Sequence, residues 1–201
     1  GYDVRGMSGF FERLQQSTRL YENNATAYLR THPLTGERLS DMQNREQPVA
    51  YRQVADSADF QLVRARARAL QGRPVDAVRD FEALLRDKKY SSEAATRYGL
   101  AVALARKGDW AAAEKELQAV RKLKMSGAMV DRLLAEVKIA QGEREAGLLL
   151  YREAMVRYPL NLALLYGYGS ALIGEKKFAE ALRFADEQLR NYPQDARFYR
   201  M

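Results

Sequence analysis

Hydrophobic residues recur at helical spacing along most of the chain. Between about residues 58 and 195, apolar side chains return every three or four positions, which places them on one face of an α-helix. Each such stretch is roughly 13–15 residues long, and a short polar turn separates it from the next. The pattern predicts an all-α protein built from consecutive short helices.

The turns themselves repeat. Four similar turn segments begin 36, 34 and 34 residues apart, at Gly72, Gly108, Gly142 and Lys176. A small residue follows five positions later in each segment: Ala77, Ala113, Gly147 and Ala181. Pro159 and Pro193 again lie 34 residues apart and are expected to end the second helix of the last two units. A helix–turn–helix unit of this length with these features is typical of the tetratricopeptide repeat (TPR).

The repeats fix a register. The four units are 58–91, 94–127, 128–161 and 162–195, within a repeat domain at 57–195 that is followed by a tail at 196–201. Each first helix carries a small residue that allows close helix packing: Ala65, Ala101, Ala135 and Gly169. A large side chain follows the second small residue in three units, at Phe81, Leu117 and Tyr151, whereas Ala185 takes this place in the fourth. Because three units usually make a stable stack, we expect a TPR solenoid of about four repeats.

Local helix signals agree with this register. Pro74 suits a first helical position, Asp109 and Asn161 can cap helices, and Ser92 followed by Glu93 opens another. Trp110 begins a second helix, where we expect it to brace the turn.

Residues 1–56 do not fit the repeat. A helix is predicted over about residues 5–16, with its apolar face formed by Met7, Phe10, Phe11 and Leu14. A turn over 31–35 is expected to lead into a second helix that ends near Glu46. The apolar face needs a cover, which either the first repeat or a second copy of the chain would supply; the second case would make the protein a homo-oligomer.

Composition narrows the chemistry. The chain of 201 residues has no Cys and one His, so thiolate sites, His-based metal cages and classical catalytic triads cannot form within it. No apolar run approaches the ~20 residues of a membrane span. The formal net charge is +7, and this surplus lies entirely in residues 57–201. Since basic and acidic residues are mixed along the helices, this charge is expected to interact favourably with the helix dipoles and to keep the protein soluble.

The N-terminal segment resembles a known family. Residues 1–7 (Gly-Tyr-Asp-Val-Arg-Gly-Met), 10–14 (Phe-Phe-Glu-Arg-Leu), 31–34 (Thr-His-Pro-Leu) and 37–39 (Glu-Arg-Leu) are similar to the end of a Ste24-like zinc metallopeptidase domain. Combined with a TPR tail, they resemble the BepA-type periplasmic proteases of Gram-negative bacteria. Val4 stands where that family often has Pro. The resemblance implies that residues 1–56 are the C-terminal remnant of a protease domain.

The catalytic residues of that family are absent from this chain. The chemistry needs a His-Glu-x-x-His helix and a further Glu ligand, and one His cannot supply two. The resemblance therefore implies a fragment without catalytic residues, metal or cofactor, whose zinc belongs to the parent enzyme. It also implies a periplasmic location. We expect no peptidase activity from this chain alone.

His32 has two interpretations. Its ring can hydrogen-bond locally and fix the Thr-His-Pro bend. Alternatively, His32 is a zinc-site neighbour in the parent enzyme, where a neutral imidazole could take the open coordination position of the catalytic zinc. Neither interpretation predicts a metal in this chain.

The inner face of the repeat array is the candidate binding surface. In TPR proteins, set positions of the first helices line a concave groove, and here they hold Leu62, Arg66, Tyr98, Val102, Arg132, Glu136, Tyr166 and Ser170. Tyr and Arg are strong contact residues at protein interfaces, and a basic groove favours a carboxylate-bearing partner. Packing between repeats is the alternative role for Tyr98 and Tyr166.

Three functions follow. The first is a module that binds substrate or partner proteins for a periplasmic zinc metalloprotease in outer-membrane protein assembly and quality control. The second is a stand-alone TPR adaptor without an enzymatic link. The third is nucleic-acid binding, but the sequence lacks the aromatic and basic platform that such binding needs.

Overall fold

The computed structural model describes residues 6–18, 35–46 and 55–200, which are helical with connecting turns and contain no strand. The chain divides into two compact units, Gly1–Asp56 and Ser57–Met201, and each is described here by itself.

The first unit contains two helices that pack against each other, α1 (Gly6–Thr18) and α2 (Thr35–Glu46). Both were predicted from the sequence. On α1, the rings of Phe10 and Phe11 meet edge to face with their centroids 5.4 Å apart. Met7 and Phe10 are each about half exposed, so the expected apolar face is present on this helix. The side chain of Leu14 lies outside the described residues, as does the turn that contains His32.

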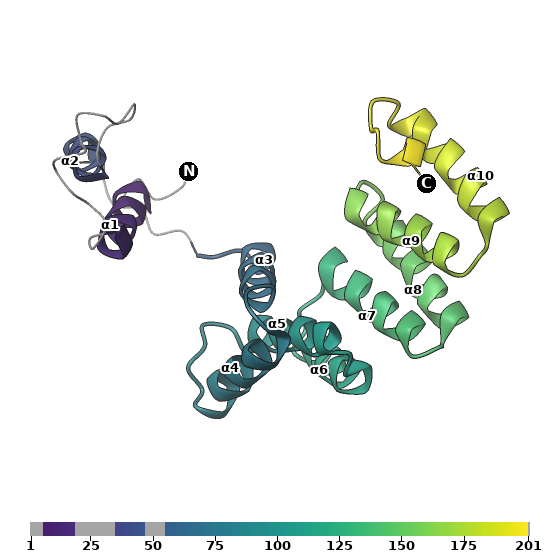
Figure 1. The fold of residues 1–201 in the computed structure, drawn as a ribbon, viewed down its shortest axis with the longest axis horizontal. Coiled ribbons are helices and arrows are strands. Elements are labelled where there is room, and N and C mark those ends of the chain that lie inside the picture. Colours follow the sequence, from purple (N-terminus) through teal and green to yellow (C-terminus); the bar gives the residue numbers. More distant parts are fainter. Residues whose placement is uncertain (1–5, 19–34, 47–54, 201) are drawn as a thin grey trace. The chain divides into compact units, whose positions relative to one another are not determined.

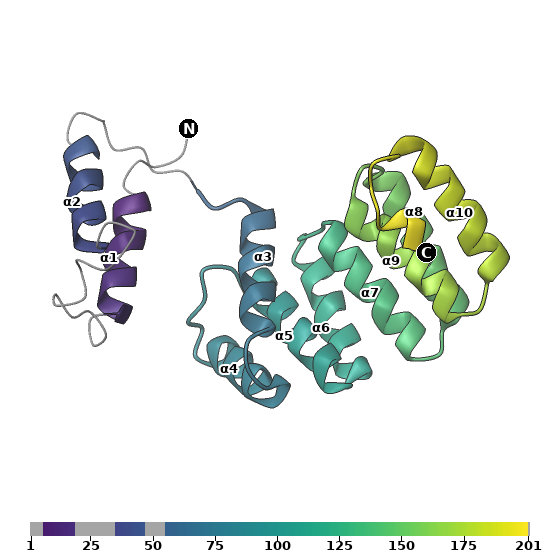
Figure 2. The same ribbon diagram turned by 45° about the horizontal axis from the view of Figure 1, so that its top comes forward.

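Eight helices build the second unit (Figure 1). They form four successive helical hairpins, and their bounds are α3 (Ala58–Ala69), α4 (Pro74–Arg86), α5 (Glu93–Lys107), α6 (Trp110–Lys122), α7 (Ala128–Ala140), α8 (Arg144–Arg157), α9 (Leu162–Gly174) and α10 (Phe178–Asn191). Figure 2 shows these helices following one another in chain order along the unit. The predicted all-α repeat architecture is confirmed.

Short-range signals set the helix ends. The side chains of Ser92, Asp109 and Asn161 each accept a hydrogen bond from the backbone amide three residues on, at the starts of α5, α6 and α9. Pro74 is the first residue of α4, where its missing N–H costs no hydrogen bond. Ser57 caps α3 in the same manner, which the sequence analysis did not predict.

The hairpin turns share one backbone conformation. The equivalent residues Gly72, Gly108 and Gly142 have φ of 59°, 87° and 88°, in the left-handed region that favours glycine. Lys176 takes the same position in the fourth hairpin with a φ of 59°. The fourth turn therefore keeps the shared geometry without the glycine.

Small residues bring the paired helices together in the second and third hairpins. Ala101 and Ala113 have no exposed surface, and neither does Ala135. A Cβ atom on Gly147 would lie 2.8 Å from the carbonyl oxygen of Ala135. Because only a hydrogen fits at this contact, α7 and α8 can pack closely along their length.

The first hairpin is more open. Helix α3 packs mainly on α5 and touches α4 little, whereas α5 with α6 and α7 with α8 contact each other extensively. A charged residue, Arg68, occupies the position at which the second and fourth hairpins have the buried Leu104 and Leu172, and the third has Lys138. Its guanidinium lies 5.6 Å from the centre of the Phe81 ring on α4.

The C-terminal residues are more than a tail. A 3₁₀-helix, η2 (Phe198–Arg200), follows α10 and packs on it. Phe198 is 1% exposed, and its ring centroid lies 4.5 Å from that of Tyr166 on α9. Residues 196–201 were expected to form a simple tail, because one buried aromatic near a chain end carries no periodic signal.

Candidate partner-binding surface

The eight residues predicted to line the inner groove divide into two groups. Leu62 and Tyr98 have no exposed surface, and Val102 is 3% exposed. All three belong to one apolar core cluster, so in this structure their side chains support the helices and do not line a surface. Helical spacing alone does not distinguish a groove position from a core position one or two residues away.

Four of the remaining residues converge. Arg132 and Glu136 on α7, with Tyr166 and Ser170 on α9, line a single hollow of about 430 Å³. Tyr151 from α8 contributes to its wall, and the apolar surface comes from Ile139, Ala140, Ala171 and Gly174. The hollow therefore combines a mostly apolar lining with a few polar groups, which is the usual chemistry of a recognition site.

Tyr151 is a lining residue that the groove prediction missed. It belongs to the second helix of its hairpin, yet its hydroxyl reaches toward α9 because Gly167 leaves space there. A Cβ atom on Gly167 would lie 2.7 Å from this hydroxyl oxygen. Burial raises the pKa of Tyr151, and the nearby carboxylate of Glu136 raises it further. In the sequence, the feature that could have indicated this contact is the large residue at 151 together with the glycine at 167.

The charge of Arg132 is balanced within its own helix. Its Nε donates a hydrogen bond of 2.8 Å to Oε1 of Glu136, one turn along α7. Burial alone would lower the pKa of Arg132, but Glu136 and Tyr151 outweigh burial and leave this pKa above its ordinary value. At this place the groove presents an ion pair and not the excess positive charge that the sequence suggested.

Arg66 and Tyr98 mark the other part of the inner face. Arg66 is half-buried on α3 and close enough to Tyr98 to oppose the rise in the pKa of that phenol, which burial causes. The Tyr98 hydroxyl has no hydrogen-bond partner of good geometry among the described residues. Within this part of the groove, Arg66 supplies positive charge, whereas the buried Tyr98 packs against the helices.

The C-terminal residues occupy one side of Tyr166. Its hydroxyl hydrogen-bonds the carboxylate of Asp195, and the guanidinium of Arg197 lies 4.0 Å from the centre of its ring. Burial and the hydrogen bond to Asp195 raise the pKa of Tyr166 to about 12. Arg197 and Tyr166 hold the pKa of Asp195 well below its usual range. Tyr166 is therefore fixed in place beside the hollow.

Across residues 6–18, 35–46 and 55–200, no group of three or more His, Asp or Glu side chains is arranged to hold a metal ion. No helix in the described part of the chain is long and apolar enough to cross a membrane.

One curated relative covers nearly the whole chain. It is the beta-barrel assembly-enhancing protease of Yersinia pestis, which is 24% identical over 196 residues. The match spans 97% of this chain but 40% of the relative, so the chain corresponds to less than half of that protein's length.

Two solved structures share the fold at low sequence identity. PilW, a widely conserved type IV pilus biogenesis factor, is 15% identical with a TM-score of 0.59, over 96% of this chain and 87% of its own. A MamA double mutant, MamA RS-1 ArsTM, is 18% identical with a TM-score of 0.52, over 73% of this chain and 81% of its own.

The family model for the tetratricopeptide repeat matches residues 62–128 and 132–196. These two ranges follow the four hairpins and cover most of the chain. The repeat period, the helical hairpins and this match agree, and the chain belongs to the tetratricopeptide repeat family.

Proposed function

We propose that this chain is a protein–protein interaction module that holds a segment of a partner protein in the hollow between α7 and α9. The observation that carries the proposal is the convergence of Arg132, Glu136, Tyr166 and Ser170 on one hollow with an apolar lining. Tyr and Arg contribute strongly at interfaces because they combine large contact area with hydrogen bonding.

The charges refine the kind of segment that fits. A partner carboxylate at Arg132 competes with Glu136, so we expect the hollow to favour an apolar side chain flanked by neutral hydrogen-bonding groups. Positive charge on the inner face is stronger at Arg66, where an acidic residue of the partner is favoured. The bound segment is thus apolar in the middle and acidic toward α3.

We further propose that the module belongs to a periplasmic zinc metalloprotease and binds substrates or partners, the outer-membrane assembly machinery included. The N-terminal motifs and the 24% identity to the Yersinia pestis protease support this. The zinc and its ligands would then lie in the parent enzyme, outside these residues. A stand-alone TPR adaptor is the second candidate, favoured by the likeness to PilW over 96% of the chain. A His-Glu-x-x-His motif upstream in the same reading frame would decide between them.

Site-specific cross-linking tests the groove. A photo-activatable amino acid at Ser170, which is exposed within the hollow, should cross-link a defined protein of the bacterial envelope. The same amino acid at Arg152, which is exposed on α8 and not part of the hollow, is the control position. Equal cross-linking of the same protein from both positions would move binding away from the inner face.

A charge-reversal pair provides the matched variant. Arg66→Glu with Arg132→Glu should abolish cross-linking at Ser170, because it places two carboxylates side by side at 132 and 136. Arg86→Glu with Arg152→Glu makes the same change of net charge on exposed second-helix positions and should leave cross-linking intact. Helicity measured by circular dichroism should be the same for both pairs. Unchanged capture by the groove pair would contradict the proposal.

A further inference from the structure

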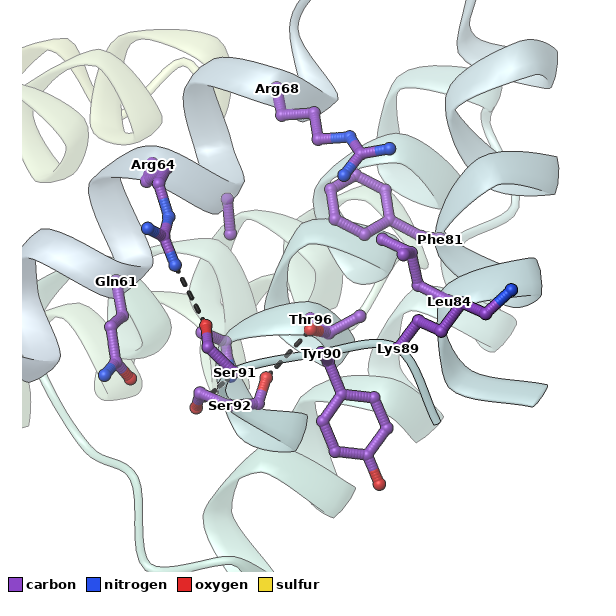
Figure 3. Close-up of a pocket in the computed structure, with 12 residues that line it drawn as sticks. Gln61, Arg64, Arg68, Phe81, Leu84, Lys89, Tyr90, Ser91, Ser92 and Thr96 are labelled. Carbon is purple, nitrogen blue, oxygen red and sulfur yellow. Dashed lines mark hydrogen bonds between the residues drawn. The ribbon is translucent and has the colours of Figure 1, made fainter. Parts of the chain in front are cut away.

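The open first hairpin holds a second cavity, separate from the inner groove. It has a volume of about 340 Å³ and is lined by residues of α3, α4, the connection between α4 and α5, and the start of α5 (Figure 3). It exists because α3 touches α4 little, unlike the first helices of the second and third hairpins. None of the hollow's residues from α7 and α9 contributes to it.

The lining of this cavity is basic on one side. Arg64 and Arg68 reach across it from successive turns of α3, and none of its twelve lining residues is acidic. Within residues 6–18, 35–46 and 55–200, no carboxylate lies at ion-pair distance from Arg68, whose guanidinium rests over the Phe81 ring instead. Arg64 donates a hydrogen bond of 2.9 Å to the hydroxyl of Ser91, which holds its guanidinium toward the cavity.

The opposite side carries apolar side chains next to Lys89. Phe81 and Leu84 of α4 face the two arginines (Figure 3), and Ala65 of α3 and Ala95 of α5 add further apolar lining. The nearby hydroxyls are largely engaged within the protein: Thr96 donates to the backbone carbonyl of Ser92, and the Ser92 side chain caps α5. A ligand therefore meets two guanidinium groups and an aromatic–aliphatic wall a short distance apart.

We propose that this cavity binds a peptide segment in which a carboxylate lies next to an apolar side chain. Guanidinium groups recognise carboxylates through paired hydrogen bonds, and Arg68 has no carboxylate partner among the described residues. The apolar wall selects for a neighbouring aromatic or aliphatic side chain, which an inorganic anion or a nucleic-acid phosphate cannot provide. This site is independent of the inner groove, so its test and that of the groove can fail separately.

N-acetyl-phenylalanine is a minimal probe, because it carries a carboxylate and an aromatic ring. Added to the full chain, it should shift the backbone amide signals of Ser91, Ala95 and Thr96 in ¹H–¹⁵N NMR spectra, with saturation in the millimolar range (about 1–10 mM) expected for a ligand this small. N-acetyl-phenylalaninamide lacks the charge and should bind at least about tenfold more weakly. Inorganic phosphate lacks the ring and should also bind more weakly.

The double variant Arg64→Gln with Arg68→Gln should lose these shifts. Both residues are exposed, so the fold should persist. Arg79→Gln with Arg86→Gln removes the same charge from exposed positions of α4 outside the cavity and is the control. Binding of the amide as tight as that of the acid, phosphate binding equal to that of the acid, or unchanged shifts in the Arg64/Arg68 variant would each overturn the proposal.

Discussion

The ring of Phe81 on α4 occupies the space that a side chain at Gly99 on α5 would need. A Cβ atom at Gly99 would lie 2.4 Å from two of the ring carbons, closer than such atoms approach in proteins. The same relationship recurs two repeats later, where Tyr151 meets Gly167 at 2.7 Å. At the equivalent positions between them, Leu117 and Leu133 are both buried in the core. At this contact, an aromatic residue faces a glycine in the first and third cases, and two leucines face each other in the case between them.

The substitution Gly99→Ala should therefore destabilise the protein. Phe81 is 3% exposed, so its ring would have to leave its packed position to make room for the new methyl group. We expect a loss of about 1–3 kcal/mol in the free energy of unfolding, the range for overpacked cores. Urea denaturation followed by circular dichroism measures it.

Two variants make this test specific. Gly174→Ala adds a methyl group to a helical glycine that has no atom within 4 Å of the new position. It should be neutral or stabilise by about 0.5–1 kcal/mol, because alanine favours the helix. Phe81→Leu combined with Gly99→Ala copies the Leu117 and Leu133 arrangement and should recover part of the loss. Equal effects of Gly99→Ala and Gly174→Ala would show that the close contact does not govern stability.

The helices were predictable because their signals are local. Ser92, Asp109 and Asn161 cap the helices that they precede, and the turn glycines recur at the repeat period. These features depend on residues within one turn of each other. The period alone then orders the hairpins, since each unit must bury its apolar face on the next.

The features that shape the two cavities were not predictable in this way. In the first hairpin, Arg68 meets Phe81 across two helices and lies beside the cavity. The hollow in the inner groove depends on Tyr151 reaching past Gly167 from a second helix. Both are contacts between residues more than ten positions apart.

Phe198 offers a prediction about the C-terminal end. Its ring is 1% exposed and lies against Tyr166 and Tyr192, with centroids 4.5 and 6.0 Å away. Phe198→Ala should cost about 3 kcal/mol, the scale for removing a buried aromatic side chain. Because repeats unfold partly as separate units, the loss should appear as faster amide hydrogen exchange in α9 and α10.

Tyr199 supplies the control for that measurement. It is 67% exposed in the same 3₁₀-helix, so Tyr199→Ala should leave exchange in α9 and α10 nearly unchanged. If Phe198→Ala had no larger effect than this control, the C-terminal residues would not support the fourth repeat.

The last prediction concerns alkaline pH. The pKa of Tyr166 is raised to about 12, while an unfolded tyrosine ionises near 10. Between these values the folded state keeps a proton that the unfolded state has lost, so the contribution of Tyr166 to stability is complete below about pH 10 and is lost as the pH rises toward 12. Absorbance at 295 nm should show Tyr166 ionising after the exposed tyrosines, and Tyr166→Phe should remove one late-titrating group. The stability of that variant should fall less steeply over this window than that of the natural chain. An identical slope for both would mean that the bond to Asp195 does not hold the phenol in its protonated form.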